Sequence, residues 1–122
     1  MDLKNLQEYV HSLATQQGWD TETIQTRLHY LKSEIIEATQ EITAMELAQT
    51  EEERQHHVIN LGLELFDVMW NVAEIANRYG IDLGVAAEKK MAINSNRIFS
   101  AKPKEVRMVA EEEGKIYEEN TV

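Results

Sequence analysis

A chain of 122 residues has room for one domain with a modest core, and its composition excludes several classes of protein. The absence of cysteine excludes disulfides and thiolate metal sites, and a net charge of −10 argues against nonspecific nucleic-acid binding, which needs a basic face. The N-terminus has no apolar signal segment, and no apolar run approaches the ~20 residues of a membrane span. We therefore expect a cytoplasmic protein that binds neither nucleic acid nor a membrane.

The first half of the chain carries apolar residues at helical spacing. Apolar residues three and four apart, starting at Leu3, predict a first helix over about 2–17, which Gly18 ends. A strict 4-3-4-3 apolar spacing that begins at Ile24 predicts a second helix over about 21–48. This second helix is long enough to need a partner of similar length.

The second half supplies that partner. Thr50 and Glu53 have the spacing of a capping box, which predicts a third helix over about 51–79. Asp82 can cap a fourth helix over about 83–98. The sequence therefore predicts an all-α fold, a bundle of four main helices in which the two long ones are antiparallel.

Two pairs of carboxylates stand three residues apart, Glu34 with Glu37 and Glu64 with Asp67, so the members of each pair share a helix face. If the two long helices pack side by side, all four carboxylates point toward one place, where a cation would offset their repulsion. The second pair belongs to a polar line with apolar residues on both sides, which argues against a face open to water. This line comprises Asn60, Glu64, Asp67, Asn71 and Glu74. In so acidic a chain, the alternative reading of such pairs is a solvated helix face.

Ligands that offer only oxygen favour Mg²⁺, with Mn²⁺ as a substitute, over zinc or copper. A magnesium site of this kind would bridge the oxygens of a polyphosphate and could activate water. A carboxylate near that water could act as general base. The carboxylate pairs therefore suggest phosphate chemistry.

Four other residues are candidates for substrate contact. Lys90, Asn94 and Arg97 share one face of the fourth predicted helix and could touch phosphates or a nucleoside. The alternative is a solvated basic helix end, where cations also suit the helix dipole. Trp19 could stack on a base, although a large aromatic beside an apolar stripe is often a core residue.

Taken in order, Trp19, the two carboxylate pairs, Lys90, Asn94 and Arg97-x-Phe99 resemble the MazG-type nucleotide pyrophosphohydrolases over roughly residues 15–99. That resemblance implies an all-α enzyme that assembles as a homodimer or homotetramer. It implies hydrolysis of a nucleoside triphosphate, ribo or deoxyribo, to the monophosphate and pyrophosphate, in housekeeping of the nucleotide pool. On this view residues 1–99 form the pyrophosphohydrolase domain and residues 100–122 a charged C-terminal tail to which no role is assigned.

The resemblance also implies roles for individual residues. Glu34, Glu37, Glu64 and Asp67 would hold Mg²⁺, with Glu34 and Glu37 as catalytic residues, and Lys90, Asn94 and Arg97 would contact the substrate. Trp19 remains a separate candidate for substrate contact. One position departs from the family pattern: Ser33 stands where many relatives carry a leading Glu. The group that activates water is therefore open between Glu37, Glu41 and the metal alone.

Two alternatives remain beside this reading. The same site could act on another nucleotide, such as phosphoribosyl-ATP or dUTP. In a different class, the chain could be a non-catalytic helical interaction or dimerisation module whose acidic stripes are solvated or lie in dimer contacts.

Overall fold

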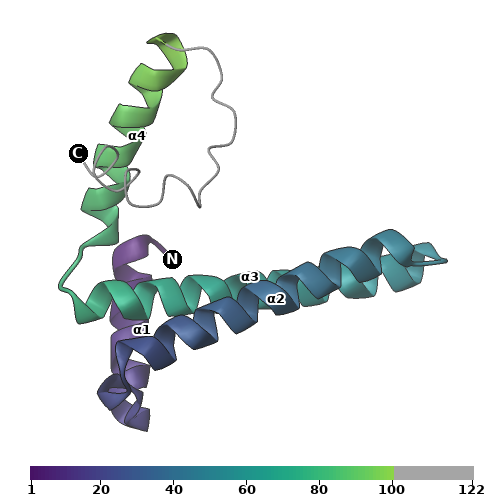
Figure 1. Ribbon diagram of the computed structural model, residues 1–122, viewed down its shortest axis with the longest axis horizontal. Coiled ribbons are helices and arrows are strands. Elements are labelled where there is room, and N and C mark those ends of the chain that lie inside the picture. The colour runs from purple at the N-terminus through teal and green to yellow at the C-terminus, as the bar shows by residue number, and fades with distance from the viewer. Residues whose placement is uncertain (101–122) are drawn as a thin grey trace. The chain divides into compact units, whose positions relative to one another are not determined.

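The computed structural model describes the backbone of residues 1–100 and the side chains of residues 1–96. This part of the chain is helical: α1 (Leu3–Gln17), a 3₁₀ turn η1 (Trp19–Thr21), α2 (Ile24–Leu47), α3 (Glu51–Arg78) and α4 (Leu83–Ser100) (Figure 1). The predicted all-α class and the four main helices are confirmed. The tail predicted after Ser100 lies outside the described residues.

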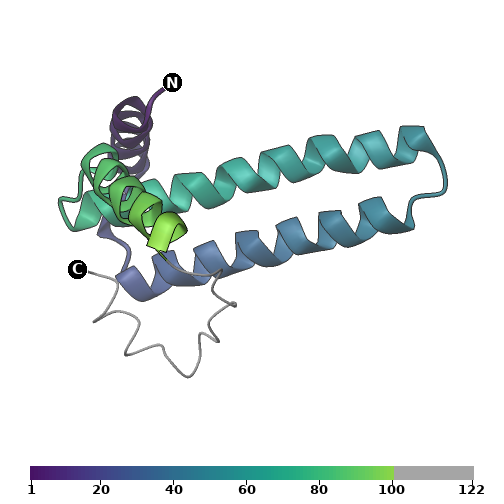
Figure 2. The ribbon, with the colours of Figure 1, turned by 90° about the horizontal axis from the view of Figure 1, so that it is seen from above.

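The chain divides within α4 into two units, Met1–Ala86 and Ala87–Val122, and each is described by itself. The first unit holds α1, η1, α2, α3 and the start of α4. In it α2 and α3 lie side by side and antiparallel along their length, as both views show (Figures 1 and 2). The predicted long antiparallel pair is therefore confirmed.

Local signals set the ends of α1 and the start of α2. Asp2 caps α1 by accepting a hydrogen bond from the Asn5 N–H (2.7 Å), and Gly18 ends the helix at φ 80°, a left-handed conformation that favours glycine. α2 begins later than the predicted residue 21. The reason is Thr23, whose hydroxyl accepts from the Thr26 N–H (3.1 Å) and so makes residue 23 the cap.

At the turn between the long helices, the first hydrogen bond of the predicted capping box forms, and the second comes from one residue before the cap. The Thr50 hydroxyl accepts from the Glu53 N–H (3.0 Å), and the Glu53 carboxylate accepts from the Gln49 N–H (3.0 Å). Nearly two turns into α3, His57 Nδ1 lies 2.7 Å from Glu41 Oε1 of α2. This contact joins the two helices near the turn end of the hairpin.

The apolar core of the first unit lies where α1 crosses the C-terminal half of α3 (Figure 1). Leu6 and Val10 of α1 pack with Ala73 of α3, and Trp70 lies against them. This small core is at one end of the long helix pair. No helix in the described part of the chain is both long and apolar enough to cross a membrane.

Candidate metal centre and adjoining cavity

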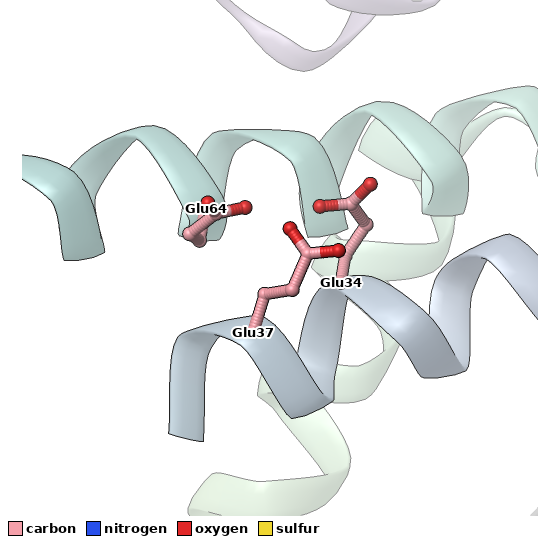
Figure 3. A group of neighbouring side chains, drawn as sticks. All are labelled: Glu34, Glu37 and Glu64. Carbon is pink, nitrogen blue, oxygen red and sulfur yellow. The ribbon is translucent and has the colours of Figure 1, made fainter. Parts of the chain in front are cut away.

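Three carboxylates from the two long helices converge in the first unit. Glu34 and Glu37 project from α2 toward Glu64 on α3 (Figure 3). One oxygen from each residue lies within 4.8 Å of the others, so one cation could contact all three. Glu34 and Glu64 are half-buried and Glu37 is exposed. The structure thus brings together three of the four predicted metal ligands, with members from both predicted pairs.

Two oxygens of this cluster lack a hydrogen-bond donor. Oε1 of Glu34 and Oε1 of Glu64 are both shielded from solvent, and neither has a partner among the described residues. Burial, followed by pairing with Glu64 and the charge of Glu37, raises the pKa of the Glu34 carboxyl from 4.5 to about 7. Burial likewise raises the pKa of Glu64. The cluster lacks positive charge, which a proton or a hard cation such as Mg²⁺ would supply.

The fourth predicted ligand, Asp67, lies outside this group of three. Asp67 is exposed on α3, one helical turn after Glu64. Its negative charge still contributes to the raised pKa of Glu34. The role of Asp67 as a metal ligand stays a prediction.

The polar line predicted on α3 faces the interior over part of its length. Asn71 and Glu74 are buried, whereas Asp67 is exposed. The Asn71 amide donates to the Asp67 main-chain oxygen (2.9 Å) and accepts from Arg27 Nη1 (3.3 Å). The expectation that this line avoids open water therefore holds for Asn71 and Glu74 and is wrong for Asp67, which borders a cavity.

That cavity, of about 500 Å³, adjoins the carboxylate cluster and shares Glu34 with it. Its size falls in the range of small-molecule sites. Its aromatic lining comes from α1, η1, α2 and α3: Tyr9, Trp19, Tyr30, Phe66 and Trp70. Its polar lining comprises Glu22, Arg27, Glu34, Asp67 and Asn71. A flat apolar group could lie against the rings while an attached anionic group extends toward the carboxylates.

Trp19, predicted as a base-stacking or core residue, is in the wall of this cavity. Its ring meets Trp70 edge-on, with centroids 5.8 Å apart. Arg78 of α3 fixes the turn that carries Trp19, because its guanidinium donates to the main-chain oxygens of Trp19 (3.1 Å) and Glu22. Arg78 is itself paired with the buried Glu74 carboxylate (3.1 Å).

The remaining predicted substrate contacts lie on α4, in the second unit. Lys90 and Asn94 are exposed there. The side chain of Arg97 lies outside the described side chains. Contact of these three residues with a substrate stays a prediction.

Sequence reasoning did not single out Arg27 or Glu22, both of which line the cavity. A signal was present for Arg27. It stands seven residues before Glu34 and ten before Glu37, a spacing that places all three on one face of α2. Nothing else in the sequence indicates that this arginine, near the start of a helix, is buried.

Comparison with known proteins finds no match for this chain among family models, curated proteins or solved structures. The findings define an all-α protein whose described part has four helices and a partly exposed acidic cluster. The resemblance to the MazG-type pyrophosphohydrolases stays a prediction.

Proposed function

We propose that this protein is a Mg²⁺-dependent nucleoside triphosphate pyrophosphohydrolase, which releases pyrophosphate and a nucleoside monophosphate. The observation that supports this most is the group of Glu34, Glu37 and Glu64, whose carboxylates meet within 4.8 Å beside an aromatic-lined cavity. A metal-ligating cluster next to flat apolar walls matches a substrate that is anionic at one end and aromatic at the other.

The donor set fits magnesium. All three groups offer oxygen, and two of the oxygens are buried without a donor in the described part of the chain. When bound, magnesium supplies charge neutralisation to a polyphosphate and activates water. The net charge of −10 makes such a bridge necessary, because the protein would otherwise repel its substrate.

The protein's own residues divide the remaining tasks. Glu37 is exposed, so it can reach a water molecule at the mouth of the cluster and take its proton. Glu41 is less suited to that role, because its carboxylate is paired with His57 at 2.7 Å. The rings of Trp19 and Trp70 bound the cavity in which a nucleoside would lie.

The direct test is product analysis with a panel of ribo- and deoxyribonucleoside triphosphates, with and without Mg²⁺. Pyrophosphate should appear only with the metal. Glu37→Gln and Asp67→Asn should each lower the rate by more than about a hundredfold, since even outer partners of a metal are each worth 10–100-fold. Glu46→Gln, on an exposed α2 residue, is the control and should retain activity.

Two outcomes contradict the proposal. Release of orthophosphate in place of pyrophosphate would overturn the reaction. Full activity in both site variants would overturn the site.

A second candidate, a non-catalytic helical interaction module, is favoured by one observation. Large apolar side chains on α2 and α3 are exposed, among them Ile36, Ile59 and Leu63. Such surfaces mark contacts with a partner chain. Absence of turnover with every nucleotide, together with formation of a complex, would favour this candidate.

A further inference from the structure

Arg27 is a buried cation in the wall of the cavity. Its side chain is only 6% exposed. Its guanidinium lies 4.8 Å from the centroid of the Tyr30 ring and 5.7 Å from that of Trp70. Arginine stacks readily on aromatic faces, so the two rings hold it in place and exclude water from it.

The hydrogen bonds of Arg27 leave part of its fork unused. Nη1 donates to the Asn71 side chain (3.3 Å) and Nη2 to the Glu22 carboxylate. Nε is buried and has no acceptor in the described part of the chain. A buried donor without an acceptor costs free energy, which a ligand oxygen seated in this cavity could recover after a small movement of the flanking rings.

The position of Arg27 along α2 separates it from the phosphate end. Arg27 precedes Glu34 by seven residues, which is about 10 Å along a helix axis. A polyphosphate held by metal at Glu34, Glu37 and Glu64 would therefore place its terminal groups away from Arg27. In that arrangement the part of a nucleotide nearest Arg27 would be the base.

We propose that Arg27 is a specificity-determining residue that selects bases with a carbonyl oxygen at C4 of a pyrimidine or C6 of a purine, namely uracil, thymine, guanine and hypoxanthine. This inference rests on the proposed nucleotide substrate. A guanidinium only donates hydrogen bonds, so it can donate to a carbonyl oxygen but has no acceptor for the exocyclic amino group of cytosine or adenine. The carboxylate beside it, Glu22, pairs with Arg27 through one of its oxygens, Oε1.

The test measures binding rather than turnover. The chain has two tryptophans, Trp19 and Trp70, and both line the cavity, so intrinsic fluorescence reports its occupancy. Titrations compare dUMP with dCMP, and IMP with AMP. The two members of each pair differ in whether the base carries a carbonyl oxygen or an amino group at the same ring position. With Mg²⁺ present, the carbonyl member of each pair should bind about tenfold more tightly or better. Equal affinities, or a preference for the amino member, would overturn the proposal.

Variants then assign the preference to Arg27. Arg27→Met should reduce the ratio within each pair to about one, and Arg27→Lys, which keeps the charge but not the planar fork, should also reduce it. Arg54→Met, on an exposed arginine of α3, is the matched control and should leave the ratio unchanged. Circular dichroism checks folding, and if Arg27→Met does not fold, Arg27→Lys and the wild-type ratio decide. A ratio unchanged in a folded Arg27 variant would overturn the proposal.

The binding readout separates this inference from the proposed reaction. A carbonyl preference without pyrophosphate release from any triphosphate would overturn the reaction and leave the base selection standing. Pyrophosphate release without any base preference would overturn the base selection alone. Absence of nucleotide binding would overturn the base selection.

Discussion

At Glu34, burial and charge act in the same direction. The carboxyl is half-buried, and Glu64, Glu37 and Asp67 all act on it, so its pKa rises to about 7. The pKa of Glu64 is also raised, first by burial. A folded state with raised carboxyl pKa values holds more protons than the unfolded chain, whose glutamates titrate near 4.5.

This predicts a stability that falls as pH rises. In metal-free protein, the favourable contribution of Glu34 is fully present below about pH 4.5 and is lost as pH rises through its folded pKa of about 7. Glu64→Gln removes one of the interacting charges and should therefore stabilise the metal-free protein at pH 7 to 8. Urea unfolding of wild type and variant between pH 4.5 and 8 measures the difference, and Glu46→Gln on the same hairpin should follow the wild-type curve.

The same unfolding measurements on wild type and Glu64→Gln can be repeated with Mg²⁺ present. An ion that binds only the folded state should add about 2.7 kcal/mol at a hundredfold excess over its Kd. The gain should be largest at neutral pH, where the carboxylates are ionised, and should be mostly absent in Glu64→Gln. If Mg²⁺ shifts neither unfolding curve, or shifts both equally, the carboxylates form no metal site.

The sequence predicted the residues of the cluster better than their arrangement. Spacing alone puts Glu34 with Glu37, and Glu64 with Asp67, on common helix faces. Which of these four carboxylates meet depends on the rotation and register of α2 against α3. Packing along the full length of the two helices sets both. Glu64 consequently joins the α2 carboxylates, while Asp67 faces the cavity.

Among the elements, η1 depends on a distant helix for its position. Arg78, at the end of α3, donates to the main-chain oxygens of Trp19 in η1 and of Glu22 just after it. It also pairs with Glu74, whose side chain is 3% exposed. The same guanidinium thus neutralises a buried carboxylate and holds the turn that carries Trp19. A buried ion pair broken on one side leaves an uncompensated charge.

Arg78→Met should therefore lower the free energy of unfolding by about 3 kcal/mol or more. Glu74→Gln added to Arg78→Met removes the stranded charge and should recover much of this loss. The Trp19 environment, followed by fluorescence, should stay altered in the double variant because the main-chain contacts are not restored. Arg54→Met breaks an exposed pair and should change stability by less than about 1 kcal/mol. A double variant no more stable than Arg78→Met would show that Glu74 does not need its partner.

Element boundaries followed local chemistry closely. Gly18, Thr50 and Asp82 act where the sequence placed them, with Asp82 accepting from the Val85 N–H (3.1 Å). The start of α2 was wrong because Thr21 and Thr23 are equally plausible caps by type, and only the structure shows that Thr23 is used. Thr21 instead ends η1, where its hydroxyl donates to the Gly18 main-chain oxygen (2.9 Å).

At the scale of the first unit, the long helix pair extends well beyond its core. α2 and α3 are about 36 and 42 Å long, while the core packs against α1 at one end of the pair. Within Met1–Ala86, no other described helix covers the turn end of the hairpin (Figure 2). Large apolar residues of α3 such as Leu65 and Val72 are exposed in this unit.

These exposed side chains predict self-association. Ile59 is 64% exposed and Leu63 62%, and their four-residue spacing puts them on one face of α3. Exposed apolar surface of this kind, on a chain with a net charge of −10, indicates contact with a partner chain. A second copy related by twofold symmetry would bury the same face on both chains.

We expect a homodimer or homotetramer by light scattering at micromolar concentration. Leu63→Arg should shift the species toward monomer, whereas Gln55→Arg, an exposed polar position on the same helix, should not. A wild-type monomer that persists to about 100 μM, far above the Kd of a stable dimer, would refute self-association.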